Sequence, residues 1–262
     1  MSNEAIKSMV KEKYGQIALT VKTTGCCGSG ESDYSCMNDD YSKLEGYNPD
    51  ADLNLGCGLP TEFARISKGD TVLDLGSGAG NDCFVARSLT GPEGKVIGVD
   101  MTEPMIARAK QNAAKLGYEN IEFRLGEIEA MPVADGEADV VVSNCVLNLV
   151  PEKKKAFEEM HRVLKPGGHF CVSDIVLEGN LPKAVEEAAV LYAGCVSGAQ
   201  QKGDYVRGIL DAGFVNVKIE KQKTIKLPDE TLAPYLSPSE IHEFRSSGVG
   251  IYSITVYGEK QS

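Results

Sequence analysis

The stretch VLDLGSGAGND, Val72–Asp82, decides the fold of this chain. A short apolar run with strand character leads directly into glycines, and Asn81 then opens a segment with helical spacing. Glycines let the backbone turn tightly and approach a ligand at the carboxyl end of a sheet. The dinucleotide pattern G-x-G-x-x-G fits Gly76 and Gly78, but its last position is Asn81. The loop therefore indicates a ligand site that departs from the usual dinucleotide site.

Acidic residues around this loop indicate which ligand it binds. Asp74 lies at the strand end, where its carboxylate would repel a pyrophosphate and attract the ammonium group of a methionyl moiety. This favours S-adenosylmethionine (SAM) over NAD. Asp100 ends the next strand about twenty residues downstream, where an acid can bind ribose hydroxyls. The segment GEIEAMP, Gly126–Pro132, ends the third strand, the usual place for an adenine pocket. A glycine-rich turn without a ligand is the less favoured alternative, because a strand and a helix flank the turn as the motif requires.

The pattern around the loop predicts an α/β fold. Apolar strands alternate with helices, which is typical of a parallel sheet covered on both faces. Strands are expected at 71–76, 95–100, 121–127, 138–144, 169–177, 215–227 and 250–260. Helices are expected at 3–14, 81–90, 102–117, 151–168, 181–195 and 203–213. The chain ends on a strand with no preceding helix of the earlier type, which predicts an antiparallel strand at the sheet edge.

Composition narrows the class of partner. The 262 residues, 42% of them hydrophobic, can form one large α/β domain with an appendage. A formal net charge of −11 argues against nucleic acid, because binding phosphates needs clustered Lys and Arg. No stretch approaches the ~20 apolar residues of a membrane helix, so no membrane partner is expected. The N-terminus is charged and lacks an apolar signal core, and we therefore expect a cytoplasmic protein.

The chain holds eight cysteines, which is many for a reducing compartment. They are more typical of reduced thiols with chemical or metal-binding roles than of a disulfide scaffold. Cys83 on a helix and Cys171 within a strand are expected in the core. The others are Cys26, Cys27, Cys36, Cys57, Cys145 and Cys195.

Three cysteines lie where loops meet the expected SAM face. Cys57 lies between two glycines that we expect to expose it, and Cys195 lies where a helix breaks on glycines. Cys145 follows the fourth strand, where core filler and ligand are equally good interpretations of that residue alone. Three thiolates suit a soft, thiophilic centre such as trivalent arsenic. Arsenic attacks a methyl group through its lone pair, so it needs no general base, and no His–acid pair stands beside the SAM loops among His161, His169 and His242.

The chain resembles known families in its motifs. From about Lys68 to Leu177 it resembles the class I SAM-dependent methyltransferases, including RVLKPGG at Arg162–Gly168. This resemblance implies a Rossmann-like, mostly parallel sheet of seven strands with an antiparallel last strand. The SAM site would be formed by strand ends and the glycine loop. Its expected residues are Asp74, Gly76, Ser77, Gly78, Asp82, Asp100, Met101, Glu127, Ile128 and Asn144.

Further motifs resemble the arsenite methyltransferases, over most of the chain to about Phe214. They are TTGCCG (Thr23–Gly28), LNLGCGLP (Leu53–Pro60), SNCVLNLVPEKK (Ser143–Lys154) and GCVSGAQ (Gly194–Gln200). The resemblance implies that Cys57, Cys145 and Cys195 are catalytic and bind arsenite, with a further family cysteine matched by Cys26 or Cys27. The chain departs from the family in NLGCG, which is more aromatic in other members.

The predicted organisation is an N-terminal cysteine-bearing extension over residues 1–60 and a SAM-binding domain over 61–262. An arsenite-binding insertion is expected around 181–213. The predicted reaction is SAM-dependent methylation of arsenite, or of its thiol complexes, to methylarsenite in arsenic detoxification, and the number of methyl groups stays open. Glutathione or thioredoxin is the expected reductant and thiol partner. The alternatives are a methyltransferase acting on carbon in a quinone-type molecule and a thiol-based metal binder with zinc on Cys57, Cys145 and Cys195.

Overall fold

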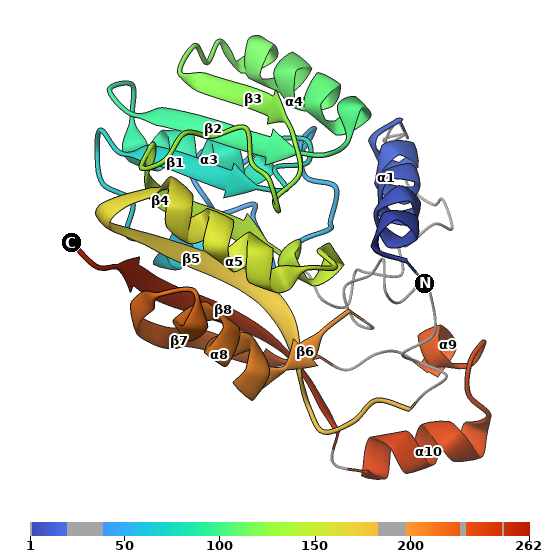
Figure 1. Cartoon of the computed structure of the whole chain (residues 1–262). Coiled ribbons are helices and arrows are strands. Elements are labelled where there is room, and N and C mark those ends of the chain that lie inside the picture. The colour runs from blue at the N-terminus through green and yellow to red at the C-terminus, as the bar shows by residue number, and fades with distance from the viewer. Residues whose placement is uncertain (1, 20–38, 183–197, 226–228, 248) are drawn as a thin grey trace.

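One sheet runs through the computed structural model of the chain, which describes residues 2–19, 39–182, 198–225, 229–247 and 249–262 (Figure 1). The strands of the sheet follow the order β3-β2-β1-β4-β5-β8-β7, and the short β6 pairs with β5. Their bounds are β1 Thr71–Leu75, β2 Lys95–Asp100, β3 Ile121–Leu125, β4 Ala138–Asn144, β5 Leu164–Glu178, β6 Gln200–Gln201, β7 Phe214–Thr224 and β8 Gly250–Lys260.

The last strand, β8, is antiparallel to both of its neighbours, while the other pairings are parallel. The predicted α/β fold with a mostly parallel sheet and an antiparallel last strand is therefore confirmed. The prediction that this strand lies at the edge is wrong. β8 pairs with β5 from His169–Glu259 to Glu178–Gly250, and β7 then adds to its outer side and forms the edge.

Helices cover both faces of the sheet. Successive strand residues point to opposite faces: Leu73 of β1 shares a buried cluster with Phe157 of α5, whereas Val72 shares another with Phe84 of α3. The helices are α1 Asn3–Leu19, α2 Pro60–Phe63, α3 Asn81–Thr90, α4 Glu103–Leu116, the 3₁₀ helix η1 Leu147–Leu149, α5 Lys153–Val163, α8 Lys202–Asp211, α9 Asp229–Leu232 and α10 Pro238–Ser246. None of the helices in the described residues has the length and apolar character needed to cross a membrane.

Local sequence explains most of these boundaries. α4 ends at Gly117, whose φ of +67° is a left-handed cap conformation that glycine adopts without strain. The helix expected over 151–168 is shorter, because Leu164 already has extended geometry two residues before Pro166, and proline disfavours a helix there. α10 was not predicted, although its capping box between Ser237 and Glu240 is a recognisable helix start.

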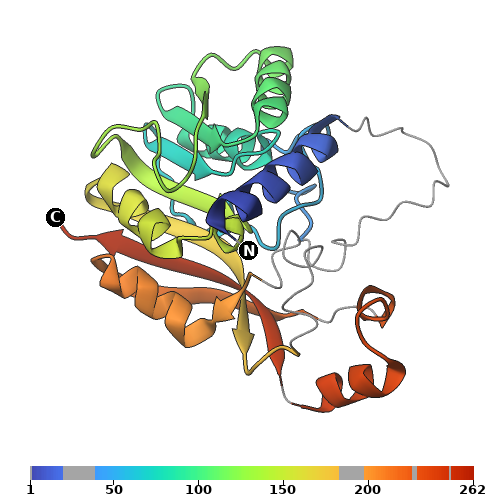
Figure 2. The same ribbon diagram turned by 45° about the vertical axis from the view of Figure 1, so that its right-hand side comes forward.

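The structure describes the predicted N-terminal extension and the predicted insertion around 181–213 only in part. α1 packs against α4, where Arg108 of α4 donates to the carbonyl of Ala18 at 3.0 Å. Figures 1 and 2 place α1 on the side of the sheet toward which β1 and β2 point. Within the range of the expected insertion, β6 pairs with β5 in the sheet, and α8 packs against β5 and β7. Residues 183–197, which include most of the predicted helix 181–195, lie outside the described part of the chain.

Candidate active site

A cavity opens at the carboxyl ends of β1, β2 and β4. Parallel strands bring these ends to one edge of the sheet, which is where ligands bind in open α/β folds. All ten residues predicted to bind the cofactor line this cavity: Asp74, Gly76, Ser77, Gly78, Asp82, Asp100, Met101, Glu127, Ile128 and Asn144. Cys145 lines it as well.

The N-terminal part of the chain completes the cavity wall, which the sequence reasoning did not predict. Lys7, Val10 and Tyr14 of α1 line the cavity, as do Tyr41 and Asp52. Nothing in the spacing of α1 separates a helix that lines a ligand cavity from one that packs on the surface. The available signal was weak: a basic helix and an acidic loop after β3.

The glycine loop is held against β2 and leaves room for a ligand. The amides of Gly76 and Ser77 donate to the carbonyl of Val99 at 2.8 and 3.0 Å. A Cβ at Gly76, where φ is +68°, would come within 2.4 Å of the Val146 side chain. A Cβ at Gly78, by contrast, would meet no atom of the described chain within 4 Å. The loop thus needs glycine for its turn, and Gly78 presents its backbone to the cavity.

Two polar groups in the cavity indicate that its ligand carries hydrogen-bonding groups. Within the described part of the chain, the Ser77 hydroxyl and the Asn81 side-chain oxygen are buried without a hydrogen-bond partner. Both residues line the cavity. Buried polar groups are normally paired, so these two are free to bind an incoming polar ligand. SAM, with its amino acid, ribose and adenine groups, fits this demand.

Three buried carboxyl groups make the cavity favourable for a cation. Burial raises the pKa of Asp74 well above its usual value, and the nearby Asp82 carboxylate raises it further. Burial also raises the pKa of Asp82 to about 6, against hydrogen bonds from Tyr41 and Asn144. Burial raises the pKa of Asp100 too, although backbone amides donate to its carboxylate. A ligand with an ammonium or sulfonium group would relieve this crowding of negative charge.

The Asn144 side chain connects the cavity to the loop that carries Cys57. Its oxygen accepts from the backbone N–H groups of Cys57 at 3.0 Å and Gly58 at 3.3 Å. Its nitrogen donates to the Gly58 carbonyl at 2.8 Å, to Asp82 at 3.3 Å and to the Tyr41 hydroxyl. Tyr41 in turn donates to Asp82 at 2.9 Å. Asn144 thus holds the thiol loop against the cavity wall.

Cys57 is fully buried, so the expectation that its flanking glycines expose it is wrong. The glycines allow close packing instead. A Cβ at Gly56 would come within 2.7 Å of the Asn144 side-chain nitrogen, and one at Gly58 within 2.5 Å of the Ser173 hydroxyl. The Ser253 hydroxyl also donates to the Cys57 carbonyl at 2.6 Å. The loop is therefore pinned from both sides with its thiol turned inward.

Cys145 lies directly after β4 in a left-handed backbone conformation, with φ of +59°. Such a conformation is strained for a residue with a Cβ. The backbone N–H of Cys145 donates to the Ser173 carbonyl at 2.7 Å, which holds the turn. Strained residues cluster at functional sites, so this geometry supports the ligand interpretation of Cys145 over core filler.

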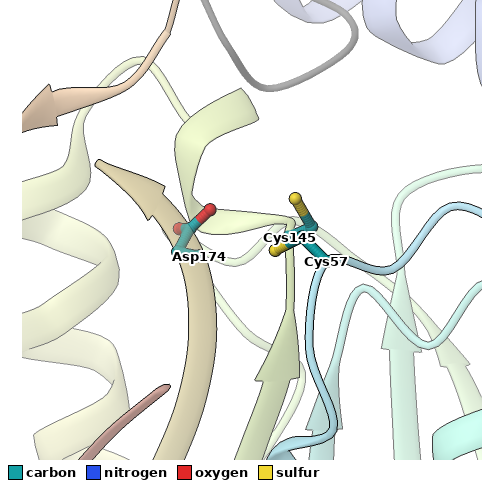
Figure 3. A group of neighbouring side chains, drawn as sticks. All are labelled: Cys57, Cys145 and Asp174. Carbon is teal, nitrogen blue, oxygen red and sulfur yellow. The ribbon is translucent and has the colours of Figure 1, made fainter. Parts of the chain in front are cut away.

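The thiols of Cys57 and Cys145 lie together with the carboxyl group of Asp174 (Figure 3). The two sulfur atoms and a carboxylate oxygen all lie within 4.8 Å of one another, and all three residues are buried. Burial raises the pKa of Asp174 to about 7, against the charge of Lys153 and several hydrogen bonds. Asp174 was not predicted, although an acid inside the apolar strand HFCVSDIVL is the same kind of signal as Asp74.

The other cysteines in the described residues, and the histidines, do not belong to the thiol pair of Cys57 and Cys145. Cys83 and Cys171 are buried in the core, as predicted. None of the three histidines lines the cavity: His161 packs on the Phe214 ring, and the imidazole Nε2 of His169 lies 2.7 Å from the Ala64 carbonyl. The predicted ligand Cys195 and its possible partners Cys26 and Cys27 lie outside the described residues, as does Cys36.

Comparisons with known proteins match most of the chain. A methyltransferase domain family matches residues 66–231. An arsenite methyltransferase of Halobacterium salinarum is 46% identical over 82% of this chain and 59% of its own length. An arsenite methyltransferase of Aquipseudomonas alcaligenes is 35% identical over 89% of this chain and 69% of its own length. This chain thus spans about three fifths of the length of the Halobacterium relative.

A solved structure shares the fold at similar identity. It is an arsenic(III) SAM methyltransferase from Chlamydomonas reinhardtii, with a TM-score of 0.67 and 35% identity. The match covers 79% of this chain and 68% of the algal one.

Proposed function

Because the chain belongs to the arsenite methyltransferase family of class I methyltransferases, we propose that it transfers a methyl group from SAM to trivalent arsenic. The observation that carries the proposal is the thiol pair of Cys57 and Cys145. The two thiols come from distant segments and meet at the end of the cofactor cavity that Cys145 lines.

The cavity residues would hold the cofactor. Asp100 and the Glu127–Ile128 segment stand at the ends of β2 and β3, the places for ribose and adenine. Asp74 and Asp82 supply carboxyl groups for the methionyl ammonium group, whose positive charge would lower their raised pKa values again. When bound, SAM supplies an electrophilic methyl group on a sulfonium centre. Asn144 places the Cys57 loop beside the methionyl end of the cavity.

The thiols would bind arsenite by ligand exchange. In each exchange an As–O and an S–H bond break, an As–S bond forms, and the hydroxyl leaves as water. Cys57 and Cys145 take two positions on arsenic, and we propose Cys195 for the third, with Cys26 or Cys27 as a further thiol. Soft thiolates suit this centre. Rate then comes from holding the arsenic lone pair in line with the methyl group, and no residue has to remove a proton.

Transfer of a methyl cation to the arsenic lone pair formally oxidises the arsenic. Two thiols can reduce it again and become a disulfide. We propose an external thiol, glutathione or thioredoxin, as the reductant that restores them.

The test is product speciation. Purified protein is incubated with SAM, arsenite and glutathione, and the arsenic species are separated and quantified by mass spectrometry. We expect methylarsenite that depends on both SAM and protein. Cys57→Ser should abolish it, while Cys171→Ala, which removes a core thiol, should retain it. If the wild-type protein forms no methylated arsenic, the proposed function is wrong.

A further inference from the structure

A buried carboxylate lies against the thiol pair, although thiol exchange with arsenic does not require one. Asp174 of β5 is 1% exposed. One of its oxygens lies within 4.8 Å of the sulfur atoms of Cys57 and Cys145 (Figure 3). Placing a carboxylate in a protein interior is unfavourable unless donors compensate it. Packing alone therefore does not explain why an acidic residue lies beside the two thiols.

Neighbouring groups fix the orientation of this carboxylate. The Ile175 backbone N–H donates to one oxygen at 3.0 Å, and the Tyr205 hydroxyl donates to the other at 3.3 Å. The backbone N–H of Asn148 also hydrogen-bonds to the group. A carboxylate has about four acceptor positions, so these donors hold it without exhausting its capacity to accept.

The two arsenic substrates differ in the group that would meet Asp174. After Cys57 and Cys145 have replaced two hydroxyls and before a third thiol binds, arsenite still carries one hydroxyl, which is a hydrogen-bond donor. Methylarsenite on the same two thiolates carries a methyl group instead. A hydroxyl donates to the acceptor position of Asp174 that remains open, whereas a methyl group covers that position and offers no donor.

We propose that Asp174 determines substrate specificity at the thiol pair: its carboxylate accepts a hydrogen bond from the hydroxyl of arsenic bound to Cys57 and Cys145. Asp174 thereby selects arsenite over methylarsenite. The inference rests on the proposed function and deepens it, because the Asp174 carboxylate would disfavour rebinding of methylarsenite, the first product. It predicts a protein that stops mainly after one methylation.

The experiment isolates the two-thiol stage in the full chain. Binding of arsenite and of methylarsenite is measured separately by equilibrium dialysis with quantified arsenic, without SAM. The parent protein carries serine at Cys26, Cys27, Cys36 and Cys195. We expect Asp174→Ala to weaken arsenite binding by about 10-fold, the size of one lost charge-assisted hydrogen bond. Methylarsenite binding should stay within about 3-fold of the parent or become tighter.

Tyr205→Phe is the matched control, since it removes a donor to Asp174 and leaves the carboxylate, so the preference for arsenite should remain. Melting curves and SAM binding check folding. If Asp174→Ala does not melt cooperatively, the isosteric Asp174→Asn replaces it, with a smaller loss of preference because an amide is the weaker acceptor.

Equal weakening of both arsenicals, or no change in either, would overturn the role of Asp174 and leave the proposed function intact. A parent protein that binds neither arsenical would also overturn the role of Asp174 at the two-thiol stage, whereas only an unaltered chain that forms no methylated arsenic would overturn the proposed function.

Discussion

The side-chain oxygen of Asn144 accepts a hydrogen bond from the backbone N–H of Cys57 at 3.0 Å. The last residue of β4 therefore holds the Cys57 loop, while the next residue in the chain, Cys145, carries the second thiol of the pair. One amide side chain thus helps to set the spacing of the two thiols, and it also contacts Asp82 of the cavity.

Replacing Asn144 by alanine should separate the thiol loop from the cavity. The change leaves the N–H of Cys57 and both backbone groups of Gly58 without this partner, so we expect a loss of at least 10-fold in arsenite methylation. The KM for arsenite should rise more than the KM for SAM, as steady-state kinetics can measure. Ser143→Ala, which removes a hydrogen bond from β4 to the Leu75 carbonyl, is the control and should keep both constants. An Asn144→Ala protein with unchanged arsenite kinetics would show that the clamp is not needed.

Removal of either of the two thiols proposed to bind arsenic should abolish methylation without unfolding the protein. We expect Cys57→Ser and Cys145→Ser each to lower the rate more than about 100-fold, because a hydroxyl is a poor ligand for a soft centre. Cys171→Ala should instead destabilise the protein by about 1 kcal/mol through the core and leave the rate per folded molecule unchanged. Arsenic speciation and denaturant unfolding measure the two effects. Full activity in Cys145→Ser would remove that residue from the reaction.

The left-handed backbone conformation of Cys145 leads to an unusual prediction for the stability of its variants. At its φ of +59° alanine is strained and glycine is not. Cys145→Gly should therefore be more stable than Cys145→Ala by about 1 kcal/mol, the reverse of the usual order at a strand end. Both variants should be inactive. Urea unfolding of the two proteins side by side provides the measurement, and a less stable glycine variant would contradict the strained geometry.

Stability should depend on pH through Asp82. Burial raises its folded-state pKa to about 6, above the ordinary value of 3.8 in the unfolded chain. The folded state therefore keeps its proton longer, and stability falls as the pH rises from about 4 to about 6. Asp82→Asn should reduce this fall by on the order of 1 kcal/mol. Urea unfolding without SAM at pH 4.5, 5.5 and 7 measures this fall in stability. Asp211→Asn, at an exposed position, is the control. If stability fell with rising pH as steeply in Asp82→Asn as in the wild-type protein, Asp82 would not be the cause.

The contact between α1 and the acidic loop should support cofactor binding. Lys7 lies 2.7 Å from Glu127 and 2.8 Å from Glu129, and both Lys7 and Glu129 are largely buried. Burial disfavours the Lys7 charge, but hydrogen bonds to both carboxylates outweigh it and raise the pKa of Lys7. Lys7→Met should thus weaken SAM binding by about 3- to 10-fold, since it leaves a buried carboxylate unpaired. Lys11→Met is the control.

Lys11 is about half exposed and lies 3.9 Å from Glu127, so its loss should change SAM binding little. Isothermal titration of both variants with SAM decides the matter. Equal affinities in the two variants would show that α1 does not support the site.

Much of the fold and the cofactor site was accessible from sequence because its signals are local. β1, the glycine loop and α3 are consecutive, and parallel strands bring Asp74, Asp100 and Asn144 to one edge of the sheet. The reversal of β8 was predicted because no helix was expected before the last strand, although the structure has α9 and α10 between β7 and β8. Its place inside the sheet was not predicted, because strand order depends on which long strand offers the better pairing partner.

The sequence by itself determined three features of this protein: the glycine motif, the alternation of strands and helices, and a set of eight cysteines typical of reduced thiols. Each of these features depends on residue types and on neighbouring residues. Only the tertiary structure decided that Cys57 is buried, that Asn144 holds its loop, and that Asp174 lies beside both thiols. These contacts join segments far apart in the chain, and their geometry results from packing of the whole sheet. No local pattern of residue types carries that information.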